Sequence, residues 1–92
     1  MKELEAVDKF CELLRKHAIG KAELYDGVAS AGRKGNKPDL DLMLRYLMEE
    51  CGEVASAITR DRPLLAKYEC IDVAHCAMLV WYSLSCNEES LV

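Results

Sequence analysis

Apolar residues near the start of the chain recur at steps of three and four, the spacing of one helix face. This pattern predicts an amphipathic helix that ends near Gly20. Its apolar stripe consists of Leu4, Val7, Cys11, Leu14 and Ala18. Residues 21–31 either continue this helix or form a second short one. Residues 31–38 contain two glycines, an asparagine and a proline, so they are predicted to form a loop.

A second helix is predicted from Asp39, a suitable N-cap after Pro38, to about Arg60. Its core stripe is expected to consist of Leu40, Leu44, Leu47, Cys51, Val54 and Ile58. Glu50 and Glu53 lie off this stripe, and their apolar neighbours are Met43, Tyr46 and Ala57. Apolar residues on two sides indicate that this helix packs against more than one partner.

A third helix is predicted over about residues 63–86, after a turn that places Pro63 at the first helical position. Its apolar residues lie almost all round the helix and include Leu65, Ile71, Val73, Ala74, Met78, Leu79, Val80, Trp81 and Leu84. A helix of this kind is normally buried. Glu69 and Asp72 within it therefore need a partner that offsets the cost of burying charge.

The composition fits one small all-α domain, spanning residues 1–92, that assembles further. Hydrophobic residues make up 51% of the chain, more than two or three helices can cover, so we expect an oligomer. The net charge of −4 and the pI near 5.1 argue against broad nucleic-acid binding, which uses basic surfaces.

Three features favour a cytoplasmic protein that does not enter a membrane. The opening MKELEAVDKF is charged and unlike a signal peptide, and the most apolar stretch, residues 73–86, is too short for a membrane span. Five cysteines with no Cys-x-x-Cys pair are expected to be mostly small buried residues in a reducing compartment. A zinc site of Cys70, His75 and Cys76 is disfavoured, because helical geometry scatters these side chains.

Four acidic residues in the second and third helices form the candidate site. Glu50 and Glu53 are three residues apart, as are Glu69 and Asp72, so each pair shares a helix face. A short turn brings the two faces together, and converging carboxylates repel one another. A hard divalent cation removes this repulsion, and oxygen ligands favour magnesium or manganese. The alternative is a solvated acidic face paired with Arg45, Arg60 and Lys67.

The run Glu49-Glu50-x-x-Glu53, followed by Glu69-x-x-Asp72, resembles the motif of the MazG-like all-α nucleotide pyrophosphohydrolases over roughly residues 40–85. The resemblance implies hydrolysis of a nucleoside triphosphate between the α and β phosphorus atoms, giving the monophosphate and pyrophosphate. It implies that Mg²⁺, or Mn²⁺, is held by Glu50, Glu53, Glu69 and Asp72. It further implies a four-helix arrangement that the partner chain of a homodimer or homotetramer completes.

In this mechanism, Glu49 or Glu53 orients or deprotonates the attacking water, a choice that the sequence leaves open. Tyr46 lies one helical turn before Glu50 and borders the expected nucleotide pocket. His75 is either a core histidine or a residue that contacts the substrate or hydrogen-bonds Asp72. The loop cations Arg33, Lys34 and Lys37 are either solvated or bind the outgoing pyrophosphate.

Three other functions are compatible with parts of this pattern. Phosphoribosyl-ATP pyrophosphohydrolase, an enzyme of histidine biosynthesis, belongs to the same superfamily and is of similar length. A non-catalytic helical interaction or regulatory protein would keep the fold without the chemistry. A redox di-metal site built on Glu50-x-x-Glu53 and Asp72-x-x-His75 is disfavoured, because the usual Glu-x-x-His is absent.

Overall fold

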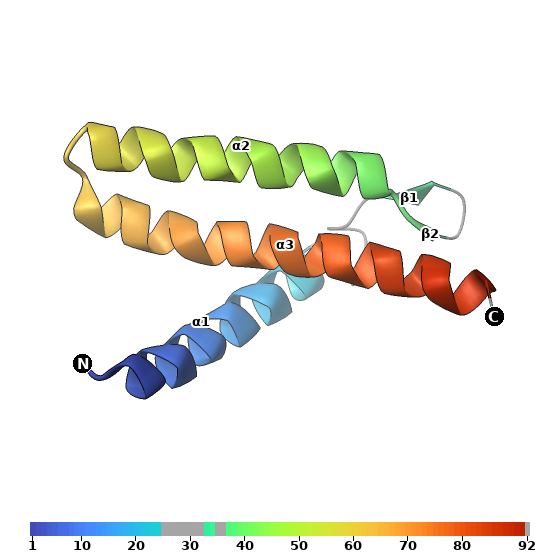
Figure 1. Ribbon diagram of the computed structural model, residues 1–92, viewed down its shortest axis with the longest axis horizontal. Helices are drawn as coiled ribbons and strands as arrows, with labels where there is room; N and C mark the ends of the chain where they lie inside the picture. Colours follow the sequence, from blue (N-terminus) through green and yellow to red (C-terminus); the bar gives the residue numbers. More distant parts are fainter. Residues whose placement is uncertain (25–32, 35–36, 92) are drawn as a thin grey trace.

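Three helices make up most of the chain in this computed structural model: α1 (Glu3–Leu24), α2 (Leu40–Thr59) and α3 (Pro63–Leu91) (Figure 1). The structure describes the backbone of residues 1–24, 33–34 and 37–91, and the side chains of residues 1–21 and 39–85. This part of the chain is all-α apart from two short strands, β1 (Arg33–Lys34) and β2 (Lys37–Pro38). The predicted fold class is therefore confirmed at the level of an all-α chain.

The two short strands lie within the segment that was predicted to be a loop. Arg33 pairs with Pro38 and Lys34 with Lys37 in antiparallel register. The two residues between the strands, Gly35 and Asn36, lie outside the described residues. Of the predicted span 21–31, residues 21–24 continue α1 and residues 25–31 lie outside the described residues.

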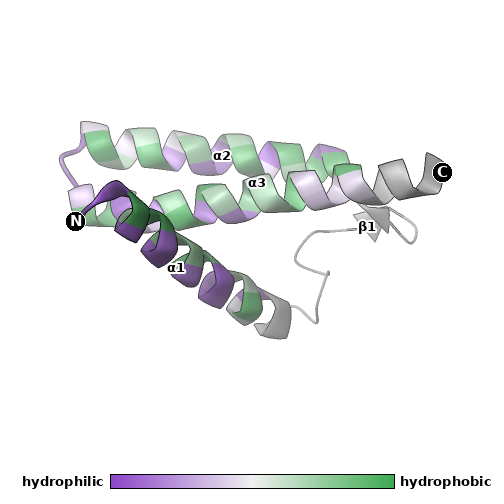
Figure 2. Ribbon diagram, turned by 60° about the horizontal axis from the view of Figure 1, so that its bottom comes forward, coloured by the Kyte–Doolittle hydropathy of each residue, from purple (hydrophilic) through white to green (hydrophobic). Residues whose placement is uncertain are grey.

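Helix α1 runs through Gly20, where the sequence predicted its end. One glycine costs a helix about 1 kcal/mol relative to alanine, and the good helix formers that follow it, Lys21 to Leu24, offset this cost. The first half of α1 is exposed, whereas Leu14 and Ala18 in its second half are partly buried. Figure 1 shows α1 crossing α3 at an angle, and Figure 2 shows how hydrophilic much of its surface is.

Helix α2 begins and ends where its sequence predicts. Asp39 is the N-cap, with an extended backbone and a side chain that accepts a hydrogen bond from the Leu42 N–H at 3.2 Å. At the other end, the N–H of Arg62 donates to the Ala57 carbonyl and the N–H of Asp61 donates to that of Ile58. These are the two bonds of a Schellman motif, and Asp61 takes its left-handed position with φ of 55°.

Helix α3 starts at Pro63, as predicted, and continues five residues past the expected end at residue 86. No glycine or proline occurs after Pro63, so nothing in the sequence interrupts the helix there. Figure 1 shows α2 and α3 lying antiparallel and side by side. The fully buried Met43, near the start of α2, packs against Leu79 of α3.

The structure corrects three expectations about burial. In the predicted core stripe of α2, Leu44 and Ile58 are 48% and 65% exposed, because a neighbouring face, which includes Met43 and Ala57, packs on α3. Helix α3 is not buried all round, because α2, part of α1 and β2 cover only some of its faces within the part of the chain that the structure describes. Among the described side chains of α3, the large apolar residues that are exposed are Leu64, Leu65, Tyr68, Trp81 and Leu84.

The expectation of mostly buried cysteines is also wrong for the described side chains. Cys11, Cys51 and Cys70 are exposed and only Cys76 is buried, because the helix faces that carry the first three have no covering element in one chain. Over the residues that the structure describes, no helix combines the length and apolar character needed to cross a membrane.

Candidate metal centre

Three carboxylates converge where α2 faces α3. One oxygen atom each from Glu50 of α2 and from Glu69 and Asp72 of α3 lies within 4.8 Å of the other two. Glu50 stands seven residues from both Met43 and Ala57, which places it on the same buried face of α2. Packing of this face on α3 therefore brings Glu50 to the motif carboxylates of α3.

The cluster holds more negative charge than its surroundings neutralise. Glu50 Oε2 and Glu69 Oε2 are both buried, and neither has a hydrogen-bond partner among the described residues. Burial, followed by the neighbouring carboxyl of Glu53 and then those of Asp72 and Glu69, raises the pKa of Glu50 to about 7. Burial and the carboxyls of Glu53 and Asp72 likewise raise the pKa of Glu69. In the absence of a cation, the carboxyls of Glu50 and Glu69 therefore bind their protons more tightly than ordinary glutamates do.

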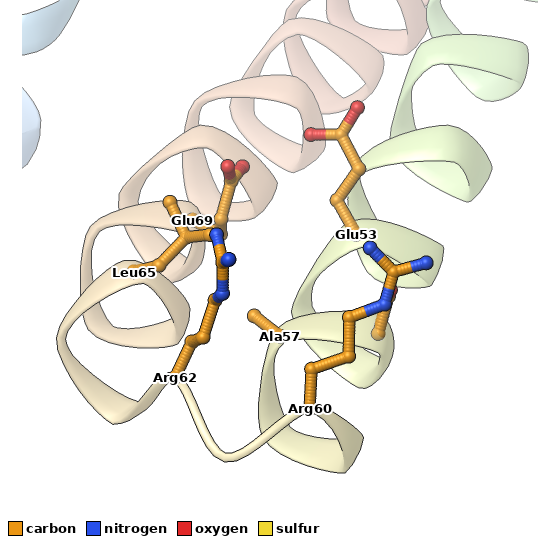
Figure 3. A pocket seen from close by; sticks show the side chains of 7 residues that line it. Glu53, Ala57, Arg60, Arg62, Leu65 and Glu69 are labelled. Carbon is orange, nitrogen blue, oxygen red and sulfur yellow. The ribbon is translucent and has the colours of Figure 1, made fainter.

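Glu53 lies at the edge of this cluster. Its side chain is exposed, and it lines an open pocket of about 170 Å³ together with Glu69. Figure 3 shows the carboxyl groups of Glu53 and Glu69 projecting from facing helices. The structure thus brings three of the four predicted ligands, Glu50, Glu69 and Asp72, together, with one oxygen atom of each within 4.8 Å of the others. The fourth, Glu53, lies beside them.

Helix α1 contributes a site residue that sequence reasoning missed. His17 Nε2 lies 3.1 Å from Asp72 Oδ1, and both side chains are partly buried. The His17 ring meets the His75 ring edge to face, with centroids 5.0 Å apart. A histidine next to the apolar positions Leu14 and Ala18 was the available signal, but nothing local indicates which carboxylate it meets.

His75 is 6% exposed and lies beneath His17. Burial, with smaller effects from His17 and Lys21, lowers the pKa of His75, so its ring is held neutral. The contact to Asp72 that the sequence suggested for His75 is therefore made by His17. A redox site that uses His75 is not favoured, since the group of potential ligands within the described residues is purely carboxylate.

Of the other predicted site residues, Glu49 and Tyr46 have described side chains, and neither belongs to the group of converging carboxylates. Glu49 is exposed and does not line the pocket, and Tyr46 is 39% exposed. The side chains of Arg33, Lys34 and Lys37 lie outside the described residues. Burial raises the pKa of the Cys76 thiol to about 11, which opposes the thiolate that a zinc site with Cys70 and His75 requires.

The structure tests only the ion pairs that the alternative of a solvated acidic face requires, since Glu49 and Glu53 are exposed and the three clustered carboxylates are half-buried. Among the described residues, the ion pairs join Glu12 to Lys9 and Lys16, and His17 contacts Asp72. None of them joins the clustered carboxylates to Arg45, Arg60 or Lys67, the three cations that this alternative requires. Within the described residues, Glu50, Glu69 and Asp72 therefore lie close to one another, and Asp72 also contacts His17.

No protein family, curated protein or solved structure matches this chain. Its function is therefore inferred from the site itself.

Proposed function

We propose that the protein is a magnesium-dependent nucleoside triphosphate pyrophosphohydrolase of the MazG-like type. It cleaves the triphosphate between the α and β phosphorus atoms and releases a nucleoside monophosphate and pyrophosphate. The observation that carries this proposal is the convergence of Glu50, Glu69 and Asp72, with one buried oxygen atom on each glutamate left without a hydrogen-bond partner in the described part of the chain.

The residues present fit a hard divalent cation. All three converging groups are carboxylates, the ligands that magnesium and manganese prefer, and their mutual repulsion disappears once a cation lies between them. Glu50, Glu69 and Asp72 would hold the metal, with Glu53 beside them. The bound ion supplies positive charge that offsets the negative charge of the phosphate oxygens.

Glu53 is better placed than Glu49 to act on the attacking water. It borders both the carboxylate cluster and the open pocket, whereas Glu49 does not line that pocket. In the proposed reaction, the Glu53 carboxylate takes a proton from water as the water oxygen bonds to the α-phosphorus. The bond from this phosphorus to the bridging oxygen breaks, and that oxygen leaves with the pyrophosphate. No covalent enzyme intermediate is required.

We further propose that a second copy of the chain completes a four-helix arrangement, as a homodimer or homotetramer. The support is a stripe on α2 that points away from α3 and repeats at the spacing of a helix-packing seam. This exposed α2 stripe consists of Leu44, Met48, Cys51, Ala55 and Ile58. A partner helix packed along it would cover apolar surface that one chain leaves in water.

Pyrophosphate release with magnesium tests the activity. The substrates are the canonical ribo- and deoxynucleoside triphosphates and phosphoribosyl-ATP, and the variants are Glu69→Gln and, as a control, Asp41→Asn, an exposed acid on α2. We expect release with one or a few substrates, lost in Glu69→Gln and kept in the control. A folded wild-type protein that releases pyrophosphate from none of them would contradict the proposal.

A further inference from the structure

The open pocket beside the carboxylate cluster also contains two arginines. Arg60 and Arg62 line it at the end nearest the turn between α2 and α3, and Glu53 and Glu69 line its other end. Figure 3 shows both arginine side chains extending along the pocket in the direction of these glutamates. The pocket thus joins an acidic end, where a cation fits, to a basic end, where an anion fits.

The position of the two arginines is fixed by the turn. The backbone N–H of Arg60 donates to the Ser56 carbonyl at 3.0 Å, and that of Arg62 donates to the Ala57 carbonyl at 2.9 Å. Asp61 between them adopts the left-handed conformation that closes α2. Both side chains therefore start from hydrogen-bonded backbone, and Pro63 restrains the chain immediately after them.

Neither guanidinium takes part in an ion pair within the described part of the chain, although two glutamates line the same pocket. Arginine presents several N–H donors in a planar fork that matches phosphate oxygens, so two such groups at one end of a pocket suit a phosphate chain. Arg60 follows Glu53 by seven residues, which corresponds to about 10 Å along the axis of α2. Figure 3 shows the side chains of Arg60 and Arg62 extending from the turn towards Glu53 and Glu69.

We propose that this pocket is the subsite for the β- and γ-phosphates, and therefore for the leaving pyrophosphate, with Arg60 and Arg62 binding its oxygen atoms. This assignment rests on the proposed function, and it gives the turn arginines the role that the sequence suggested for Arg33, Lys34 and Lys37, whose side chains lie outside the described residues. The metal at the carboxylates and the guanidiniums at the turn then neutralise the phosphate chain from its two ends. The Ser56 hydroxyl, which also lines the pocket, adds a neutral donor.

Calorimetric binding of inorganic pyrophosphate in the presence of Mg²⁺ tests the subsite directly. The proteins are wild type, Arg60→Gln with Arg62→Gln, and the matched control Arg45→Gln, which changes an exposed arginine of α2 outside the pocket. Because the double variant loses charge-assisted hydrogen bonds from exposed side chains, we expect it to bind pyrophosphate about ten- to a hundredfold more weakly, which corresponds to about 1.4–2.8 kcal/mol. Binding to the control should match that of wild type.

A nucleoside monophosphate provides the second arm. The double variant should bind it within about twofold of wild type, because each arginine meets only the phosphates that leave. Equal losses for both ligands, unchanged pyrophosphate affinity in the double variant, or no pyrophosphate binding by wild type would overturn the subsite. Pyrophosphate binding that depends on the arginines, in a protein that hydrolyses no triphosphate, would refute the proposed function alone. Hydrolysis with an unchanged KM in the double variant would refute the subsite alone.

Discussion

At the scale of single residues, Glu50 combines an apolar location with an acidic side chain. It shares the packed face of α2 with Met43 and Ala57, where a hydrophobic residue would stabilise the contact with α3. The pKa of Glu50 is raised because burial and the neighbouring carboxyls destabilise its ionised form. Groups that destabilise a fold in this way concentrate at functional sites, which is consistent with a cation-binding role.

The pKa of Glu50 predicts how the stability of the metal-free protein depends on pH. Its folded value of about 7 lies above the ordinary 4.5, so the folded state binds this proton more tightly than the unfolded chain does. The resulting stabilisation is complete below about pH 4.5 and is lost as the pH rises through about 7. The carboxyls that face Glu50, those of Glu53, Asp72 and Glu69, all oppose its ionisation.

Thermal unfolding in a chelator, scanned across this range, measures the effect. Relative to Glu50→Gln, the wild type should lose melting temperature as the pH rises, and added Mn²⁺ should restore it at the alkaline end. Glu49→Gln, which changes an exposed acid one residue earlier, serves as the control and should follow the wild type. Parallel curves for wild type and Glu50→Gln would refute the assignment of the shift to this residue.

At the scale of elements, local signals correctly predicted the boundaries of α2 and the start of α3, although Gly20 does not end α1. Asp39 and the Asp61-Arg62-Pro63 turn act through their immediate neighbours, so both ends of α2 and the start of α3 could be predicted. The buried face of α2 could not, because this helix is apolar on two sides and only the packing partner selects one.

The same reasoning explains which parts of the site were foreseen. Glu50, Glu69 and Asp72 come from adjacent helices, so their i, i+3 spacing and a short turn suffice to bring them together. His17 reaches Asp72 from a helix that is separated from α2 by residues 25–39, and its contact depends on how α1 crosses α3. No periodicity within α1 contains that information.

His17 is expected to position Asp72 through their 3.1 Å contact. Residues that hold a ligating carboxylate in place typically contribute ten- to a hundredfold to metal affinity, so His17→Ala should weaken Mn²⁺ binding by about that factor. Lys16→Ala, at an exposed neighbouring position, should leave the affinity unchanged. Titration followed by electron paramagnetic resonance gives the free Mn²⁺ concentration, and an unaltered affinity in His17→Ala would exclude the positioning role.

At the scale of the whole molecule, the chain leaves much apolar surface in water. The exposed α2 stripe runs along one side of the helix pair, and Trp81 and Leu84 of α3 are 68% and 52% exposed. Exposed apolar surface of this extent typically marks an interaction surface. This surface is the one on which the proposed second copy of the chain would pack.

Met48→Lys tests whether the exposed α2 stripe is the contact between copies. Met48 is 68% exposed in one chain, so the substitution should leave the monomer fold intact but place an unpaired charge in the proposed interface. We expect the dissociation constant to rise at least about tenfold, which corresponds to 1.4 kcal/mol. Leu64→Lys, at a 64% exposed residue of α3 outside the stripe, is the control.

Sedimentation velocity across a range of protein concentrations gives the dissociation constant for association between copies in each variant. Since lysine lowers the net negative charge in each variant, a loss of association in Met48→Lys alone cannot arise from general repulsion. Identical behaviour of the two variants would place the interface elsewhere or leave the protein monomeric.

The short connection between α2 and α3 also has a consequence for the order of folding. Only Arg60, Asp61 and Arg62 separate the two helices, so little chain entropy is lost when their faces meet. Contacts between elements adjacent in sequence form quickly, whereas α1 must close the longer segment before it reaches α3. We therefore expect the three carboxylates to come together as α2 packs on α3, and His17 to dock on Asp72 afterwards.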